Sequence, residues 1–248
     1  IYNRKSGNPD HSIAFKMVLS DQMAETKVLD VVWNASKDGY LKPRVRVEPI
    51  RLSGVKIEYA TGFNGAFIES NRIGVGALIQ IIRSGDVIPY IKEIITPADQ
   101  GLMPTVPYIW NDTHVDIMLE NKDDDKTVRE KIITGFFKGI KVDSMGEGNV
   151  IRIIDAGFDT IPKILRMSEE DFLTIDGFKG KMAKKLHDGI RDKVESASLI
   201  TLMSASNTLG RGFSGKKIEL IMEEYSDILT SEEDSKTKIQ KLGSIKGM

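Results

Sequence analysis

The amino-acid sequence predicts a multidomain α+β protein in which a small antiparallel β-barrel is followed by an all-α domain. Between Val28 and Ile95, short segments that favour β-strands follow one another closely, with Gly or Pro between them. Such spacing is typical of a small closed barrel. From Lys131 onward the pattern is helical, and an apolar pair, a tight Gly-containing turn and a helix recur. The length of 248 residues allows one large domain or two or three small ones.

Composition excludes several classes of protein. Hydrophobic residues make up 40% of the chain, which allows buried cores, and no apolar run approaches the length of a membrane span. The absence of cysteine excludes a disulfide framework and a thiolate metal site, and it fits a cytoplasmic protein. The formal net charge of -1 argues weakly against a nucleic-acid partner. Basic residues nevertheless cluster at 4–5, 37–51 and 179–185, which predicts a locally basic face.

The predicted elements of the first half are short strands. Residues 2–10 are expected to form a loop, and His11–Leu19 a strand on which Lys16 lies opposite the larger apolar side chains. Ala66–Arg72 is expected to be a short helix. The barrel strands are expected at Val28–Asn34, Arg44–Glu48, Val55–Ala60, Leu78–Ile82 and Tyr90–Ile95.

The stretch from Thr96 to Arg129 is expected to be a connector. It begins with several Pro and Gly residues, which interrupt regular structure. Its aspartates, spread over residues 112–125, suit a solvated loop. His114 is an isolated histidine there, and one histidine alone cannot hold a metal.

Four Gly-containing turns are predicted in the helical part. Glycine lets the backbone turn with positive φ, and the helix that follows then points unpaired N–H groups and the positive end of its dipole outward. A DNA phosphate can bind there without any base contact. The alternative is a small helical bundle whose glycines are C-caps, but the repetition favours phosphate-binding turns. The turns lie at Val142–Gly148, Ile175–Ala183, Leu209–Gly212 (followed by Lys216 and Lys217) and Leu242–Met248.

A series of short blocks in the first half resembles one enzyme family in order and spacing. The blocks are Ile13–Lys16, Lys37–Pro43, Val47–Ile50, Ala60–Asn64, Ile73–Gly74 and Arg83–Pro89. The series is similar to the end of the adenylation domain and the oligonucleotide-binding (OB) barrel of NAD-dependent DNA ligases. The four turns resemble the helix-hairpin-helix array that follows that barrel. The resemblance implies that residues 1–26 are the tail end of the adenylation domain, 27–98 the OB-fold, 99–130 a connector replacing the family's four-cysteine zinc module, and 131–248 the helix-hairpin-helix domain.

The resemblance also implies roles for individual residues. Lys16 is implied to be catalytic and to bind the cofactor, through the phosphate of the adenylate, where a strand-mounted ammonium stabilises the transition state. Lys37 and Arg83 are implied to contact DNA from the barrel. In the helical part the implied DNA-binding residues are Gly146, Gly177, Lys179, Gly180, Lys181, Gly210 and Gly212.

The turns depart from the family pattern of Gly–apolar–Gly. Ser144 replaces the first glycine of the first turn, Lys179 the second glycine of the second, and Arg211 the apolar residue of the third. The second turn is the most basic, and we expect it to bind phosphate best.

The function implied is that of the DNA-gripping half of a DNA ligase that serves replication and repair by sealing nicks in double-stranded DNA. NAD and Mg²⁺ are implied cofactors, held mainly by the other half, and zinc is not expected. The family's Lys-x-Asp-Gly nucleophile does not occur in this chain. It is expected on a separate subunit, as in a two-chain bacteriophage ligase acting in the host cytoplasm, or on a missing segment. The alternatives are a non-catalytic DNA clamp and, less favoured, a barrel that binds a protein partner.

Overall fold

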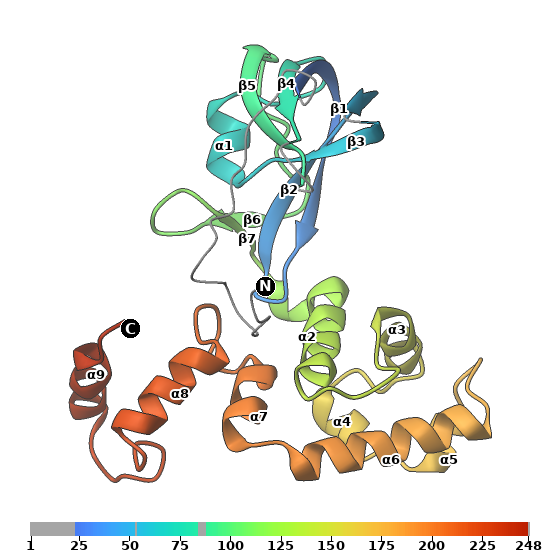
Figure 1. Ribbon diagram of the computed structural model, residues 1–248, viewed down its shortest axis with the longest axis vertical. Helices are drawn as coiled ribbons and strands as arrows, with labels where there is room; N and C mark the ends of the chain where they lie inside the picture. Colours follow the sequence, from blue (N-terminus) through green and yellow to red (C-terminus); the bar gives the residue numbers. More distant parts are fainter. Residues whose placement is uncertain (1–22, 53, 84–87, 248) are drawn as a thin grey trace, which may run out of the picture. The chain divides into compact units, whose positions relative to one another are not determined.

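The computed structural model describes residues 23–247 except 53 and 84–87, and contacts divide the chain into two units (Figure 1). The barrel unit runs to Glu120 without residues 35–39, and the helical unit comprises Ala35–Gly39 and Asn121–Met248. Lys16 and most of the Arg83–Pro89 block lie outside the described residues. Among the described helices, none is both long and apolar enough to cross a membrane.

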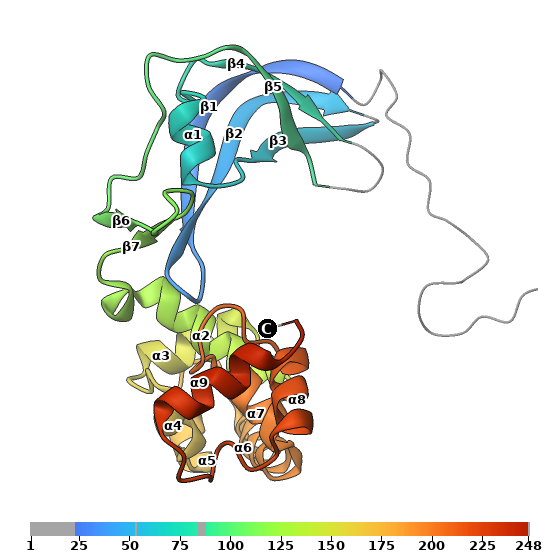
Figure 2. The ribbon, with the colours of Figure 1, turned by 90° about the vertical axis from the view of Figure 1, so that its left-hand side faces the viewer.

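Five strands close into a barrel, as predicted. They are β1 (Met23–Ala35), β2 (Tyr40–Leu52), β3 (Val55–Thr61), β4 (Leu78–Ile82) and β5 (Tyr90–Thr96), in the order β1-β4-β5-β3-β2. An additional β1–β2 pairing completes the ring. Figure 2 shows the strands curving around one another, with α1 (Gly65–Ser70) beside them. The expected barrel was antiparallel, but β3 and β5 pair in parallel at Thr61 and Tyr90.

Alternation along the strands supplies the barrel core. On β2, Val45 and Val47 are buried, whereas Arg44 and Arg46, which alternate with them, face outward. The core is completed by apolar residues of every strand and of α1, among them Val28, Ile57, Ile68, Ile79 and Ile91. At roughly 25 cal/mol per Å² of apolar surface, such burial is the main term that stabilises a barrel of this size.

Strands β1 and β2 are several residues longer than the sequence predicted, and β3 and β5 are each one residue longer. β1 begins at Met23 rather than Val28, and Met23 to Lys27 pair with Ile82 to Leu78 of β4. The first strand of the barrel therefore begins inside the segment expected to belong to the adenylation domain. β2 continues past Glu48 through an irregular register between Arg46 and Ile50, which is where Pro49 falls. A bulge tolerates proline because that position donates no ladder hydrogen bond.

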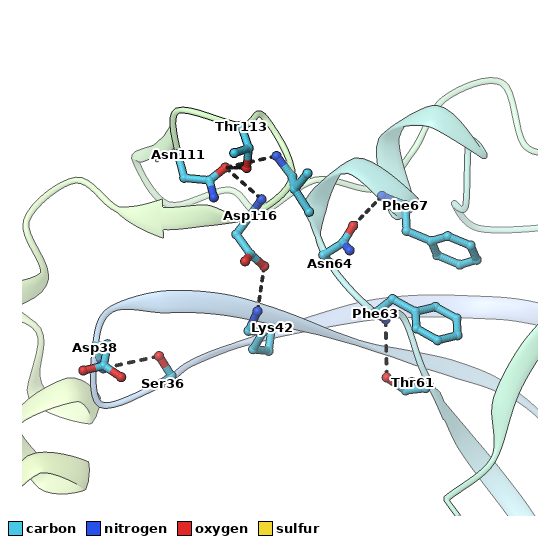
Figure 3. Close-up of polar contacts among 11 residues, drawn as sticks. Ser36, Asp38, Lys42, Thr61, Phe63, Asn64, Phe67, Asn111, Thr113 and Asp116 are labelled. Carbon is cyan, nitrogen blue, oxygen red and sulfur yellow. Dashed lines mark hydrogen bonds and ion pairs between the residues drawn. The ribbon is translucent and has the colours of Figure 1, made fainter. Parts of the chain in front are cut away.

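The expected connector contains an ordered hairpin in place of part of the solvated loop. Strands β6 (Tyr108–Trp110) and β7 (Ile117–Leu119) pair with each other, and β7 pairs with β2. Asn111 organises the turn, since its Oδ1 accepts from the backbone N–H groups of Val115 (3.0 Å) and Asp116 (3.1 Å) (Figure 3). The Asp116 carboxylate also accepts from Lys42 of β2 at 2.6 Å.

His114 stacks on the ring of Trp110 with centroids 3.8 Å apart. Among the described residues, no three His, Cys, Asp or Glu side chains are grouped so that they could hold a metal ion. The expectation that this protein lacks zinc stays a prediction.

Backbone hydrogen bonds hold the segment after β5 against the residues that follow α1. Ala98 N–H donates to Arg72 O (3.0 Å), and Leu102 N–H donates to Ile73 O (2.9 Å). The indole N–H of Trp33 donates to Leu102 O at 3.0 Å. This close approach requires a glycine, because a Cβ on Gly101 would lie 2.5 Å from the Ile68 carbonyl oxygen.

The first α-helix of the helical unit starts five residues earlier than predicted, at Lys126. After the 3₁₀ turn η2 (Lys122–Asp124), Asp125 caps α2, and its carboxylate accepts from Val128 N–H. Its core is formed by apolar residues of several helices, with Phe137 and Phe172 fully buried. The helices are α2 (Lys126–Gly139), α3 (Glu147–Asp155), α4 (Ile161–Leu165), α5 (Glu169–Leu173), α6 (Gly180–Ser196), α7 (Leu199–Ser206), α8 (Gly215–Glu224) and α9 (Ser235–Ser244).

The Gly101 contact gives a stability prediction. Gly101→Ala should lower the free energy of unfolding of the barrel by roughly 1–3 kcal/mol, because the backbone must move apart. Gly243→Ala in α9 is the control, since its Cβ meets nothing within 4 Å; it should be neutral or stabilising by up to about 1 kcal/mol. Urea denaturation followed by circular dichroism measures both. Equal effects of the two substitutions would contradict the close packing at Gly101.

Candidate nucleic-acid interface

Each of the four predicted turns contains a residue in the left-handed region. The φ angles are +83° at Gly177, +73° and +100° at Gly210 and Gly212, and +100° at Gly247. In the first turn Ser144 takes this conformation itself, with φ +64°. Serine thus adopts here the conformation that glycine takes in the other turns, at the cost in strain that a side chain brings.

The apolar residues of the first two turns anchor them in the core of the helical unit. Met145 and Phe178 are buried, at 1% and 5% exposure. In the second turn the N–H of Phe178 donates to Ile175 O at 3.1 Å, so the chain folds back tightly before α6. A helix begins directly after each of these turns, α3 after the first and α6 after the second.

Helix capping separates the helices that follow these turns from the others. Of the nine α-helices that the structure describes, six have an N-cap side chain that accepts a backbone N–H bond: α1, α2, α4, α5, α7 and α9. The helices after the first, second and third turns are α3, α6 and α8. Their N-caps are Gly146, Lys179 and Ser214, and none makes a side-chain cap bond. Their first N–H groups are therefore without this internal acceptor, and an anion can supply one.

The lysines at these helix starts are not engaged by acidic side chains. Within the part of the chain that the structure describes, Lys179, Lys181, Lys216 and Lys217 make no ion pair. Lys184, one turn further along α6, is instead paired with Asp188 at 3.0 Å. That hydrogen bond raises the pKa of Lys184, while bonds from His187 and Lys184 lower the pKa of Asp188.

The three helix starts are unequal in charge. The second turn has lysines on both sides of Gly180, at which a Cβ would meet nothing within 4 Å. The first turn has Glu147 in the first turn of α3, which opposes an anion. Lys185 of α6 partly offsets this, because its Nζ donates to Ser144 Oγ at 3.0 Å. The start of α6 is therefore more basic than the start of α3, and the start of α8, with Lys216 and Lys217 and no acidic residue in its first turn, is comparably basic.

One cation near the second turn was not predicted. A Cβ on Gly177 would lie 3.0 Å from Nη1 of Arg152, so this guanidinium lies directly against the turn. Arg152 comes from α3 and is distant from Gly177 in the sequence. Only the packing of α3 brings the two together, and nothing local in the sequence indicates it.

Of the two other predicted residues that the structure describes, Lys37 lies beside the third turn, because its partner Asn207 accepts the backbone N–H of Gly210 at 3.0 Å. Lys37 belongs by its contacts to the helical unit, where its Nζ donates to Asn207 Oδ1. Asn207 in turn donates to Asp38 at 2.8 Å. Arg83 directly follows β4 on the barrel unit and is partly exposed. Lys37 is therefore already engaged by a side chain of its own unit, which the sequence did not reveal.

Comparison with known proteins identifies relatives of this chain. Residues 25–101 match the family of NAD-dependent DNA ligase OB-fold domains. A DNA ligase of Acanthamoeba polyphaga mimivirus is 45% identical over 224 residues, which cover 90% of this chain and 35% of the viral protein. A DNA ligase of Desulfatibacillum aliphaticivorans is 32% identical over 213 residues, 82% of this chain and 33% of the bacterial one. The chain thus spans about a third of the length of these relatives.

The missing cap on α6 gives a prediction about stability. Lys179 has the extended backbone of an N-cap (φ -105°, ψ 166°), so Lys179→Asp should cap α6 with its own carboxylate. We expect the helical unit to gain about 1 kcal/mol in free energy of unfolding. Lys193→Asp, in the last turn of the same helix, is the charge-matched control and should be neutral or destabilising. Chemical denaturation of both variants measures this. A loss of stability in Lys179→Asp would contradict the absence of a side-chain cap bond at the start of α6.

Proposed function

We propose that this chain, whose barrel belongs to the family of NAD-dependent DNA ligase OB-fold domains, is the DNA-gripping part of a ligase. In this proposal the ligase seals 5′-phosphate/3′-hydroxyl nicks in double-stranded DNA. It acts together with an adenylation core that carries the Lys-x-Asp-Gly nucleophile, on a separate subunit or on another segment. The proposal rests on the DNA ligase relatives and on one structural observation: no N-cap side chain bonds the first N–H groups of α3, α6 and α8, and we call these helix starts vacant caps.

The vacant caps suit a helix-hairpin-helix grip on the DNA backbone. Each cap offers backbone N–H groups and the positive end of a helix to one phosphate. Lys179 and Lys181 at α6, and Lys216 and Lys217 at α8, supply counter-charge. Such contacts fix the protein on the duplex but carry no base information, which is what an enzyme acting on nicks in any sequence needs.

The chemical step is proposed to occur mainly on the adenylation core. The family resemblance implies that NAD supplies the adenylyl group and that Mg²⁺ is required. We assign both cofactors mainly to the other part, which carries the nucleophile. From this chain we propose Lys16, whose ammonium would stabilise negative charge developing at the adenylate phosphate.

The salt dependence of DNA binding tests the grip. If Lys181 neutralises one phosphate, Lys181→Gln should reduce the slope of log affinity against log salt by about one unit. Lys193→Gln, at the other end of α6, should leave the slope unchanged. Lys179→Asp should weaken binding to every nicked sequence alike, because its carboxylate occupies the cap. Fluorescence anisotropy with nicked duplexes of two unrelated sequences measures all three, and equal slopes for the two glutamine variants would exclude α6 as a phosphate site.

Reconstitution tests the enzymatic role. This chain alone should form no covalent adenylate with NAD, and a polypeptide bearing the adenylation core should restore sealing of a labelled nick. Lys16→Ala should then lower adenylyl transfer by roughly two to three powers of ten. Lys27→Ala, an exposed lysine on β1, is the control. A mixture that binds the nick but never seals it would instead support the non-catalytic clamp.

A further inference from the structure

The first two turns and the helices that follow them are built on one plan. Each turn has a left-handed residue three positions before its helix, Ser144 (φ +64°) before α3 and Gly177 (φ +83°) before α6. The next residue, Met145 or Phe178, is buried, and both belong to one core cluster of the helical unit. The two turns therefore share a core, and a side chain at its edge can contact either of them.

One cation of each helix reaches the turn that precedes the other helix. Arg152, the sixth residue of α3, lies against the second turn, where a Cβ on Gly177 would be 3.0 Å from its Nη1. Lys185, the sixth residue of α6, lies against the first turn, where its Nζ donates to Ser144 Oγ at 3.0 Å. The contacts are thus reciprocal, because equivalent positions of the two helices contact equivalent positions of the two turns.

The Lys185 contact supports a residue whose backbone conformation disfavours a side chain. Ser144 is held from its own helix by Asn149, whose Nδ2 donates to the Ser144 carbonyl oxygen at 2.7 Å. From α6 it is held only by the ammonium of Lys185. The Asp143 carboxylate also lies 3.9 Å from this ammonium, but it is 87% exposed, so the ion pair adds little. The hydrogen bond to the Ser144 hydroxyl is therefore the contact that connects the first turn to α6.

The Arg152 contact depends on the absence of a side chain at Gly177. A Cβ there would press on the guanidinium, and the positive φ disfavours one as well. Within the part of the chain that the structure describes, the Arg152 side chain makes no hydrogen bond or ion pair. It therefore restricts the second turn by packing alone, which is a weaker constraint than the hydrogen bond from Lys185.

We propose that Arg152 and Lys185 are positioning residues that couple the first two turns, so that both turns bind one DNA backbone as a single unit. If each turn moved independently, binding a phosphate at each would carry its own ordering cost. A contact from each helix to the other turn fixes their spacing in advance, so that the second phosphate is bound with less loss of entropy. The coupling is a property of the free protein, and only its consequence for DNA rests on the proposed function.

Amide hydrogen exchange of the full chain without DNA tests the coupling. Lys185→Met removes the ammonium and keeps an unbranched side chain. The amides of the first turn, residues 143–149, should then exchange roughly three- to tenfold faster, the range for losing one hydrogen bond. Arg152→Met should speed exchange in the second turn, residues 176–182, by about twofold, because only packing contacts are lost.

Two further variants are controls for the exchange experiment. Lys185→Arg keeps a charged donor at the same position and should exchange like the wild type. Lys184→Met changes the neighbouring lysine, which pairs with Asp188 at 3.0 Å, and should leave the first turn unchanged.

Binding to a nicked duplex, measured by anisotropy, gives the functional readout. Lys185→Met should weaken binding by roughly three- to tenfold, because the first turn is no longer held in place. The slope of log affinity against log salt should stay unchanged, since the ammonium of Lys185 is bonded to Ser144 and is not a phosphate ligand.

The outcomes separate the coupling from the ligase assignment. Faster exchange that is confined to the turn before the mutated residue's own helix, or that is equal throughout the helical unit, overturns the coupling. A salt slope reduced by about one unit in Lys185→Met makes this lysine a phosphate ligand and overturns its positioning role. Exchange effects in the opposite turn, with no binding of nicked duplex by the wild type, support the coupling and contradict the proposed ligase function.

Discussion

The backbone N–H groups at the start of each helix need acceptors, and this requirement organises the helical unit. An α-helix leaves its first four N–H groups without partners inside the helix. Six of the described helices meet the requirement with Asn, Asp, Ser or Thr, as Asp125 does for α2 and Ser168 for α5. Three do not, and all three follow the Gly-containing turns. A helix start that lacks an internal acceptor is less stable and more receptive to an anion, and both properties have the same physical origin.

Residues with left-handed backbone conformations differ in type between the two units. In the helical unit, Gly177, Gly210 and Gly212 adopt them without strain and let a helix begin directly after a tight turn. Ser144 shows that this geometry persists without glycine, supported by the Lys185 hydrogen bond to its hydroxyl. On the barrel, Phe63 also has a positive φ (+60°), and its N–H donates to Thr61 Oγ1 at 3.3 Å. The glycines thus let the chain turn without strain, whereas Ser144 and Phe63 adopt the same conformation with side chains that disfavour it.

The sequence predicted the features that local physical chemistry decides. Alternation revealed the barrel strands, and the Gly-containing turns were found at their observed places because positive φ favours glycine. The errors lay where distant residues decide. β1 gains its first five residues from pairing with β4, and the parallel β3–β5 contact depends on barrel closure. The β6–β7 hairpin was missed because three-residue strands leave almost no periodic signal.

The candidate interface divides along the same line. Gly180, Lys179 and Lys181 are adjacent in sequence, so their grouping at one helix start followed from the chain alone. Arg152 reaches Gly177 only through the packing of α3, and Lys37 meets Asn207 only through the fold of the helical unit. The engagement of Lys37 bears on its predicted contact with DNA, because an ammonium already bonded to an amide must exchange that bond for a phosphate. The lysines at the α6 and α8 starts exchange no such bond, so a phosphate gains their full counter-charge. We therefore expect the turns to contribute more to the proposed phosphate binding than Lys37 does.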